Sequence, residues 1–100
     1  MESQTWLRCQ IGCGQFNCEY AVRGELADGT QFSLFTDAES LEHDIEPSEG
    51  RSVDGWMKVE VLERRDNMVL VQLPRQTLEN GRFVTVNQEQ LRVAAPREPA

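Results

Sequence analysis

The chain has 100 residues, of which 39% are hydrophobic and 27% are charged, and its formal net charge is −7 at pH 7. This composition is that of one folded domain of ordinary size and excludes an intrinsically disordered chain. The acidic balance argues against a general nucleic-acid-binding face, which needs an excess of lysine and arginine.

The apolar runs and the first residues lead to an expectation about location. No apolar run approaches the roughly 20 residues that a membrane-spanning helix needs. The start, MESQTWLRCQ, lacks the basic flank and the apolar stretch of a signal peptide. We therefore expect a cytoplasmic protein without membrane contacts, whose three cysteines are reduced thiols.

The first predicted element is a hairpin around CQIGCGQFNC, the stretch that holds all three cysteines. Apolar and polar residues alternate over residues 7–11 and again over 16–22, which is typical of half-buried strands. With residues 13–14 as a two-residue turn, Cys9 lies opposite Cys18 at a separation that permits a disulfide. The same register opposes Ile11 to Phe16 and Leu7 to Tyr20.

A second hairpin follows at an Asp-Gly turn signal. The stretch TQFSLFT, residues 30–36, predicts its returning strand. A three-residue loop with a bulge sets Leu26 opposite Phe32 and Gly24 opposite Leu34. In this arrangement Gly24 marks a bend where the strands curl.

Residues 37–54 break the alternation and carry seven acidic residues against one arginine, a net charge of −6. Asp37 is expected to cap a short helical turn that places Leu41 and Ile45 on one side, and the rest is expected to be an exposed loop. Loops on rigid scaffolds commonly carry binding sites. We therefore expect a non-enzymatic protein-interaction module whose acidic loop binds a basic surface of an unidentified partner protein. The candidate partner-binding residues are Glu39, Glu42, Asp44, Glu46, Glu49 and Trp56.

The C-terminal half predicts a second group of strands. Alternation over residues 53–63 and again over 68–73 predicts a hairpin in which Val61 lies opposite Val71. The later expected elements are a strand over 82–86, one helical turn over 87–91 and a short final strand over 91–93.

Six to seven short strands with closely spaced turn signals and no long helix predict an all-β fold, a small antiparallel barrel or sandwich with one or two short helical turns. The expected organisation is one β domain over residues 1–93, with N-terminal hairpins at 5–36, the acidic loop or short helix at 37–54, a barrel-like portion at 55–93 and a flexible tail at 94–100. The order of elements over residues 53–93 resembles the closing portion of a Src-homology-three-like small barrel. That resemblance implies a fold and does not specify a function.

Two segments of the chain resemble each other, LADGTQFSLFTDAESL at 26–41 and LENGRFVTVNQEQL at 78–91. One explanation is a duplicated unit. The simpler explanation is that residues common to all hairpins recur. The sequence leaves both open.

The main alternative function is a thiol redox or zinc-binding protein that uses the N-terminal cysteines. Its candidate ligands are Cys9, Cys13, Cys18 and His43, but gaps of three and four residues differ from the close pairs of zinc sites. Cys13 as a nucleophile needs a base, and the single histidine is expected to be solvated in the acidic stretch. We therefore expect no enzyme, no metal and no cofactor. A second alternative is a small nucleic-acid-binding barrel, although nucleic acid is an unlikely partner by charge; oligomeric state is open.

Overall fold

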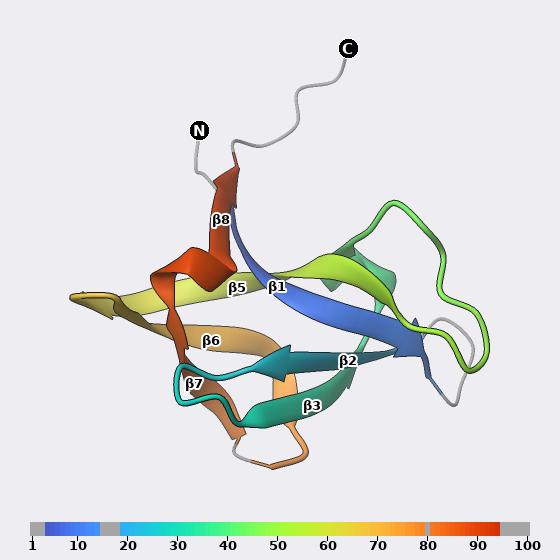
Figure 1. The fold of residues 1–100 in the computed structure, drawn as a ribbon, viewed down its shortest axis with the longest axis horizontal. Coiled ribbons are helices and arrows are strands. Elements are labelled where there is room, and N and C mark those ends of the chain that lie inside the picture. Colours follow the sequence, from blue (N-terminus) through green and yellow to red (C-terminus); the bar gives the residue numbers. More distant parts are fainter. Residues whose placement is uncertain (1–3, 15–18, 80, 95–100) are drawn as a thin grey trace.

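The computed structural model describes residues 4–14, 19–79 and 81–94 (Figure 1). Its elements are β1 (Gln4–Cys13), β2 (Tyr20–Glu25), β3 (Gln31–Thr36), the 3-10 turn η1 (Ala38–Ser40), β4 (Leu41–Glu42), β5 (Val53–Arg65), β6 (Met68–Thr77), β7 (Gly81–Asn87), the 3-10 turn η2 (Gln88–Gln90) and β8 (Leu91–Ala94). Six strands form an antiparallel sheet in the order β3-β2-β1-β5-β6-β7, and the sheet curls into a half-barrel. The predicted all-β class is confirmed. In these ranges no helix is long and apolar enough to cross a membrane.

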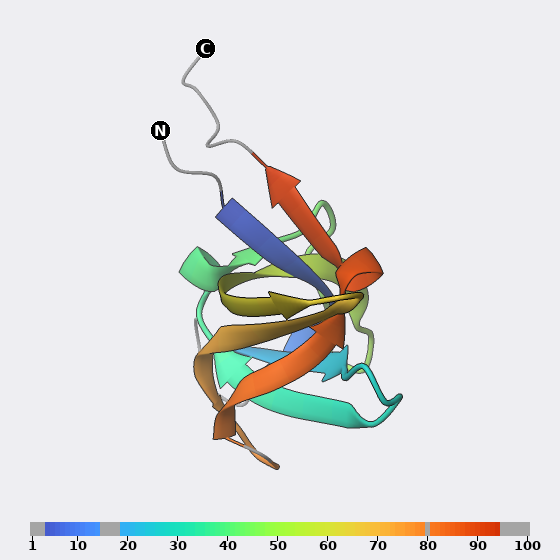
Figure 2. The ribbon, with the colours of Figure 1, turned by 90° about the vertical axis from the view of Figure 1, so that its left-hand side faces the viewer.

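The described chain consists of two units with the same order of elements. Each unit has a three-stranded meander, one 3-10 turn and one short strand; the first unit contains β1 to β4, and the second contains β5 to β8. The last strand of each unit pairs with the first strand of the other unit, since β4 pairs with β5 and β8 pairs with β1. β8 and the start of β1 project together from the body of the sheet (Figures 1 and 2).

A pseudo-two-fold axis passes through the pair formed by Leu7 of β1 and Met57 of β5. Leu7 also pairs with Leu91 of β8, and Met57 pairs in the same way with Leu41 of β4. Equivalent residues near the axis therefore differ by 50 in number, because 7 corresponds to 57 and 41 to 91. Leu7 and Met57 are both fully buried, so the axis runs through the core.

The amino-acid sequence carries the same repeat. TWLRCQI at 5–11 matches GWMKVEV at 55–61, with a tryptophan in both and a base two residues later. The segments 26–41 and 78–91 form the second part of the two units, but their phenylalanines are not equivalent, because the strand registers make Ser33 the counterpart of Phe83. Phe32 is fully buried, whereas Phe83 is 58% exposed. The two-unit topology favours a duplicated unit over the recurrence of hairpin residues, and the match at the start of each unit is a signal that we overlooked in the sequence.

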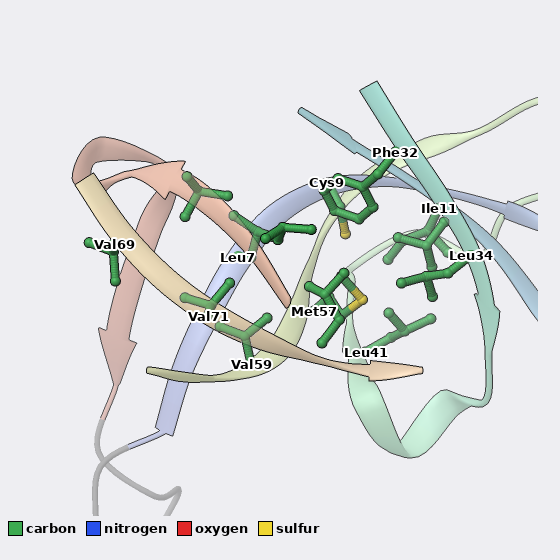
Figure 3. Packing of buried hydrophobic residues seen from close by; sticks show 14 residues of the cluster. Leu7, Cys9, Ile11, Phe32, Leu34, Leu41, Met57, Val59, Val69 and Val71 are labelled. Carbon is green, nitrogen blue, oxygen red and sulfur yellow. The ribbon is translucent and has the colours of Figure 1, made fainter. Parts of the chain in front are cut away.

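The core lies on the inner face of the curled sheet, where side chains from the two units meet (Figure 3). Every second residue of β1 points inward, which buries Leu7, Cys9 and Ile11. Full burial of such a side chain contributes about 1.5–3 kcal/mol to stability. The buried apolar residues are Leu7, Cys9, Ile11, Val22, Phe32, Leu34, Leu41, Met57, Val59, Val69, Val71, Leu73, Val84 and Val86.

The predicted register of the first hairpin is wrong. Ile11 pairs with Val22 instead of Phe16, and Cys13 pairs with Tyr20, so the connection is longer than two residues. The facing residue of Cys9 in β5 is Gly55, and the predicted partner Cys18 lies outside the described residues. Leu7 pairs with Leu91 and Met57 instead of Tyr20. The shift is an even number of residues, so it leaves the same side chains on each face of the sheet. Alternation in the sequence therefore cannot distinguish the two registers.

The second hairpin is also shifted by an even number of residues. Gly24 lies opposite Phe32, and Val22 lies opposite Leu34. Gly24 provides room for the aromatic ring of Phe32, which would overlap a Cβ atom at this position. The C-terminal hairpin pairs Val61 with Val71 as predicted, but a bulge between Val61 and Glu63 shifts the register. Arg65 therefore pairs with Met68, and the turn has two residues instead of the three expected.

The two 3-10 turns differ in how well they match the predictions. The turn after β7 and the short final strand occur where they were expected. The turn after β3 begins after Asp37, but the Asp37 side chain forms no capping hydrogen bond. Leu41 is buried, whereas Ile45 is 67% exposed, so the prediction that they share one side is wrong. β4 begins at Leu41 and carries the chain away from a helical path.

Backbone hydrogen bonds between the two units connect the margins of the half-barrel. The N–H of Ala27 donates to the carbonyl of Thr85 at 2.9 Å, and the N–H of Leu78 donates to the carbonyl of Ser33 at 2.8 Å. The carboxylate of Glu79 accepts further bonds from the N–H and the hydroxyl of Ser33, both at 2.8 Å. The segment after β6 is thereby fixed to β3.

We expect Glu79→Gln to reduce the loss of stability at acidic pH. The backbone N–H of Ser33, and then its hydroxyl, hold the pKa of Glu79 below its usual value of 4.5. A carboxyl group whose pKa is lower in the folded state stabilises the fold above the unfolded-state pKa, and this contribution is lost as pH falls through the folded-state pKa. Between about pH 5 and about pH 3, wild type should therefore lose more unfolding free energy than the variant in urea titrations. Glu60→Gln controls for the loss of one charge, and parallel curves for wild type and Glu79→Gln would contradict the prediction.

Candidate functional site

The predicted acidic segment 37–54 forms η1, β4 and the start of β5 as well as a loop over residues 43–52. This loop, called the acidic loop below, connects the last strand of the first unit to the first strand of the second (Figure 1). Within the loop Pro47 is buried. The N–H of Arg51 donates to the carbonyl of Ser48 at 2.9 Å, which closes a turn. The Tyr20 hydroxyl lies 3.3 Å from a carboxylate oxygen of Glu46. These contacts place the loop against the end of β1 and the start of β2.

The six predicted partner-binding residues divide into two groups. Asp44, Glu46 and Glu49 lie on the acidic loop with exposed side chains, and Glu39 is exposed on η1. Glu42 and Trp56 lie elsewhere, paired with each other in register on β4 and β5. The structure therefore places four candidates in exposed positions and two on the sheet near the axis.

Arg92 covers the pair formed by Glu42 and Trp56. Its Nη2 donates to Oε1 of Glu42 at 3.1 Å, and its guanidinium lies 4.5 Å from the centre of the Trp56 ring. Glu42 and Arg92 are equivalent positions in the two units. Their ion pair joins β4 and β8, the last strands of the two units, each of which pairs with the other unit. Trp56, with Arg92 over its ring, is half-buried.

His43 is less solvated than the sequence predicts. Its side chain is only 11% exposed, and its ring packs against the ring of Tyr20 with centres 5.7 Å apart. Nδ1 lies 2.9 Å from the carbonyl oxygen of Ile45, and Nε2 lies 3.7 Å from Glu46. Histidine at this position supports the base of the acidic loop, a role that local sequence does not reveal.

The cysteines described by the structure lie in different environments. Cys9 is in the core, and burial raises the pKa of its thiol to about 12, which disfavours the reactive thiolate. Cys13 is exposed, with its sulfur 3.5 Å from the carbonyl oxygen of Pro47. Cys18 lies outside the described ranges. Within those ranges no three histidine, cysteine or acidic side chains come together in a metal-binding arrangement.

Arginines near the C-terminal strands mostly contact acceptors of the same chain. Arg65, Arg75 and Arg92 each form an ion pair, at 3.4, 3.5 and 3.1 Å respectively. Arg82 donates to the carbonyls of Leu73 and Pro74. These contacts reduce the basic surface that a nucleic-acid-binding barrel would need.

Sequence reasoning missed a hollow on the outer face of the first unit. It has a volume of about 200 Å³ and lies across β1, β2 and β3. Small residues occupy its outward-facing positions, and Phe35 and Arg23 line it. The available signal was the occurrence of Ala21 and Ser33 at outward positions of two predicted strands, with Gly12 directly after a third.

Comparisons with protein-family models, with curated proteins and with solved structures found no match to this chain. The class of the protein is therefore defined by its fold, a small antiparallel β half-barrel of two pseudo-symmetric units.

Proposed function

We propose that the chain is a non-enzymatic protein-interaction module that binds a basic partner surface through the acidic loop. The observation that supports this most directly is Ile45, which is 67% exposed between the exposed carboxylates of Asp44 and Glu46. An apolar side chain within a charged rim is the usual composition of an interface. Asp44 and Glu49 form no ion pair with any residue in the described ranges.

The anchored conformation of the loop also favours binding. Pro47 is buried, and Glu46 contacts both Tyr20 and His43. A segment that is already ordered loses less conformational entropy when a partner binds. Its carboxylates would attract a basic partner over about 8–10 Å at physiological ionic strength and would act mainly on the rate of association.

We expect the triple variant Asp44→Asn/Glu46→Gln/Glu49→Gln to weaken binding of a blocked oligolysine peptide at least fivefold, or about 1 kcal/mol. Isothermal titration calorimetry at ionic strengths of about 20 and about 200 mM would measure this effect. Wild-type affinity should fall with salt, and the affinity of the variant should depend on salt less steeply.

The matched control removes three acidic charges from another part of the surface, with Glu60→Gln/Glu63→Gln/Glu89→Gln. Both triple variants change the net charge equally, so a general effect of charge would weaken binding equally in both. Equal weakening, or wild-type affinity that does not change with salt, would contradict the proposal. Circular dichroism and thermal unfolding of both variants would establish that the fold is retained.

We also propose that the second unit is related to Src-homology-three-like barrels. The support is its order of a strand, a hairpin, a further strand, a 3-10 turn and a short strand. The departure is that β8 pairs with β1, the first strand of the other unit. The thiol and zinc alternative has less support, since Cys9 is buried with a raised pKa.

A further inference from the structure

We propose that the hollow on the outer face of the first unit binds an extended peptide segment that carries an apolar side chain and a carboxylate two positions apart. This site differs from the acidic loop in place and in charge, and it does not depend on the function proposed above. The hollow has a volume of about 200 Å³, and the lining residues that give it its character are Gly12, Ala21, Arg23, Ser33 and Phe35.

The floor of the hollow is formed by small residues that face each other across the strands. Gly12 pairs with Ala21, and Ala21 pairs with Phe35, a residue that is 38% exposed. In the neighbouring row Arg23 pairs with Ser33. Phe35 thus provides an apolar surface beside the floor. The side chains of the floor are so small that a ligand can approach the backbone of the sheet.

Arg23 is the only charged residue that lines the hollow. It is exposed, and it forms no ion pair or hydrogen bond with any described side chain, although three other arginines pair with carboxylates. An adjoining pocket of about 260 Å³ shares Gln10 and Arg23 and adds a second arginine, Arg8. Two acids also line that pocket, but the carboxylate of Asp54 already accepts a hydrogen bond from Gln10.

Glu25, the other acid of the adjoining pocket, does not line the hollow beside Phe35. Arg23 lines both spaces, whereas Arg8, Glu25 and Asp54 line only the adjoining pocket, so a ligand carboxylate at the junction would meet Arg23. Guanidinium groups bind carboxylates through parallel charged hydrogen bonds, which favours a carboxylate ligand over a neutral one.

The spacing along β2 gives the pattern of the ligand. Ala21 and Arg23 are two residues apart on the outer face, which separates them by about 7 Å along the strand. Side chains two positions apart in an extended peptide have the same separation and point to the same side. An apolar side chain over Ala21 and Phe35 therefore places a carboxylate two positions away near Arg23.

The second unit provides an internal comparison. The registers make Gly12, Ala21 and Ser33 equivalent to Glu63, Leu70 and Phe83, and Arg23 equivalent to Gln72. All three floor residues are larger in the second unit. Its own shallow pocket contains Glu63 and Arg65, and these two residues form an ion pair at 3.4 Å. The combination of a small floor and an unpaired arginine thus belongs to the first unit.

The probe for a test is the blocked peptide Gly-Leu-Thr-Glu-Gly, titrated into the full chain and followed by amide chemical shifts. Shifts should concentrate at Ala21, Arg23 and Phe35. We expect the peptide with Gln for Glu, and the peptide with Ser for Leu, each to bind about tenfold more weakly. Equal binding of the Gln peptide would overturn the role of Arg23, and equal binding of the Ser peptide would overturn the role of the hollow.

Two variants exchange residues of the first unit for their equivalents in the second. Arg23→Gln should weaken binding of the acidic peptide about tenfold, and Ala21→Leu should weaken it at least tenfold by filling the floor. The control Leu70→Ala makes the reverse change in the second unit and should leave the affinity unchanged. Wild-type affinity in both first-unit variants would overturn the proposal.

Self-association through the hollow has to be distinguished from peptide binding. Sedimentation without peptide should show a monomer whose state does not change in Ala21→Leu. A dimer that Ala21→Leu dissociates would show that a second copy covers the hollow, and it would overturn the proposal. The acidic-loop triple variant should bind the acidic peptide as wild type does, so that failure of either proposal leaves the other intact.

Discussion

Replacement of Phe32 by alanine is expected to lower the free energy of unfolding by about 3–5 kcal/mol. Phe32 is completely buried and is the largest of the fully buried side chains. The substitution removes its contacts and leaves a cavity between β2 and the core, which the neighbouring strands fill only in part. Urea unfolding followed by circular dichroism measures the loss. Phe83→Ala is the control, because Phe83 is 58% exposed and its loss should cost less than about 1 kcal/mol.

The pairing of Phe32 with Gly24 allows a stricter test of the same packing. A Cβ atom at Gly24 would overlap the Cζ and Cε2 atoms of Phe32, so Gly24→Ala should cost about 1–3 kcal/mol in wild type. In the Phe32→Ala background the ring is absent, and the same change should cost little. A double-mutant cycle measures the difference as an interaction energy. Equal cost in both backgrounds would contradict the explanation.

Gly55→Ala is expected to destabilise the protein by about 1–3 kcal/mol or more, because β4 lies directly over Gly55. A Cβ atom there would lie 2.9 Å from the carbonyl oxygen of Glu42 and 3.2 Å from Cβ of His43, and it would also overlap the end of Ile11. A backbone oxygen cannot move aside without shifting β4. Thermal and urea unfolding measure the effect.

Gly12→Ala is the matched control for Gly55→Ala, since Gly12 is also a glycine within a paired strand, opposite Ala21 of β2. The nearest atoms to a Cβ at Gly12 are 3.8 Å away, which is ordinary contact. We therefore expect a change of less than about 1 kcal/mol, and alanine there avoids the entropic cost of glycine. If both substitutions destabilised the chain equally, close approach of β4 would not be the reason that Gly55 is needed.

The two-unit arrangement makes clear which surface features occur once. The acidic loop joins the two units, and it corresponds to no segment within either unit. The small floor beside Arg23 occurs only in the first unit, although the strands that carry it occur twice. By contrast, the inward residues of the two first strands are alike, because both must pack on the same core. We infer that function lies where the units differ and that stability depends on what they share.

Much of the fold follows from local sequence. Alternation predicted which residues of each strand point inward, as the burial of Leu7, Cys9 and Ile11 shows. Alternation also predicted the hairpin that pairs Val61 with Val71, and the final 3-10 turn and strand lie where they were expected. Composition alone located the acidic segment. These features depend on contacts between neighbours in the chain, and a single sequence is sufficient for them.

The arrangement of the candidate sites depended on long-range packing. Shifting a strand by an even number of residues preserves its faces, so alternation did not distinguish Val22 from Phe16 as the partner of Ile11. The exchange of last strands brings Arg92 onto Glu42, 50 positions away, and this contact partly buries Trp56. The sequence by itself determined the inward and outward faces and the acidic segment. Only the tertiary structure decided which outward residues meet across the strands, because that depends on pairing between segments that no local pattern connects.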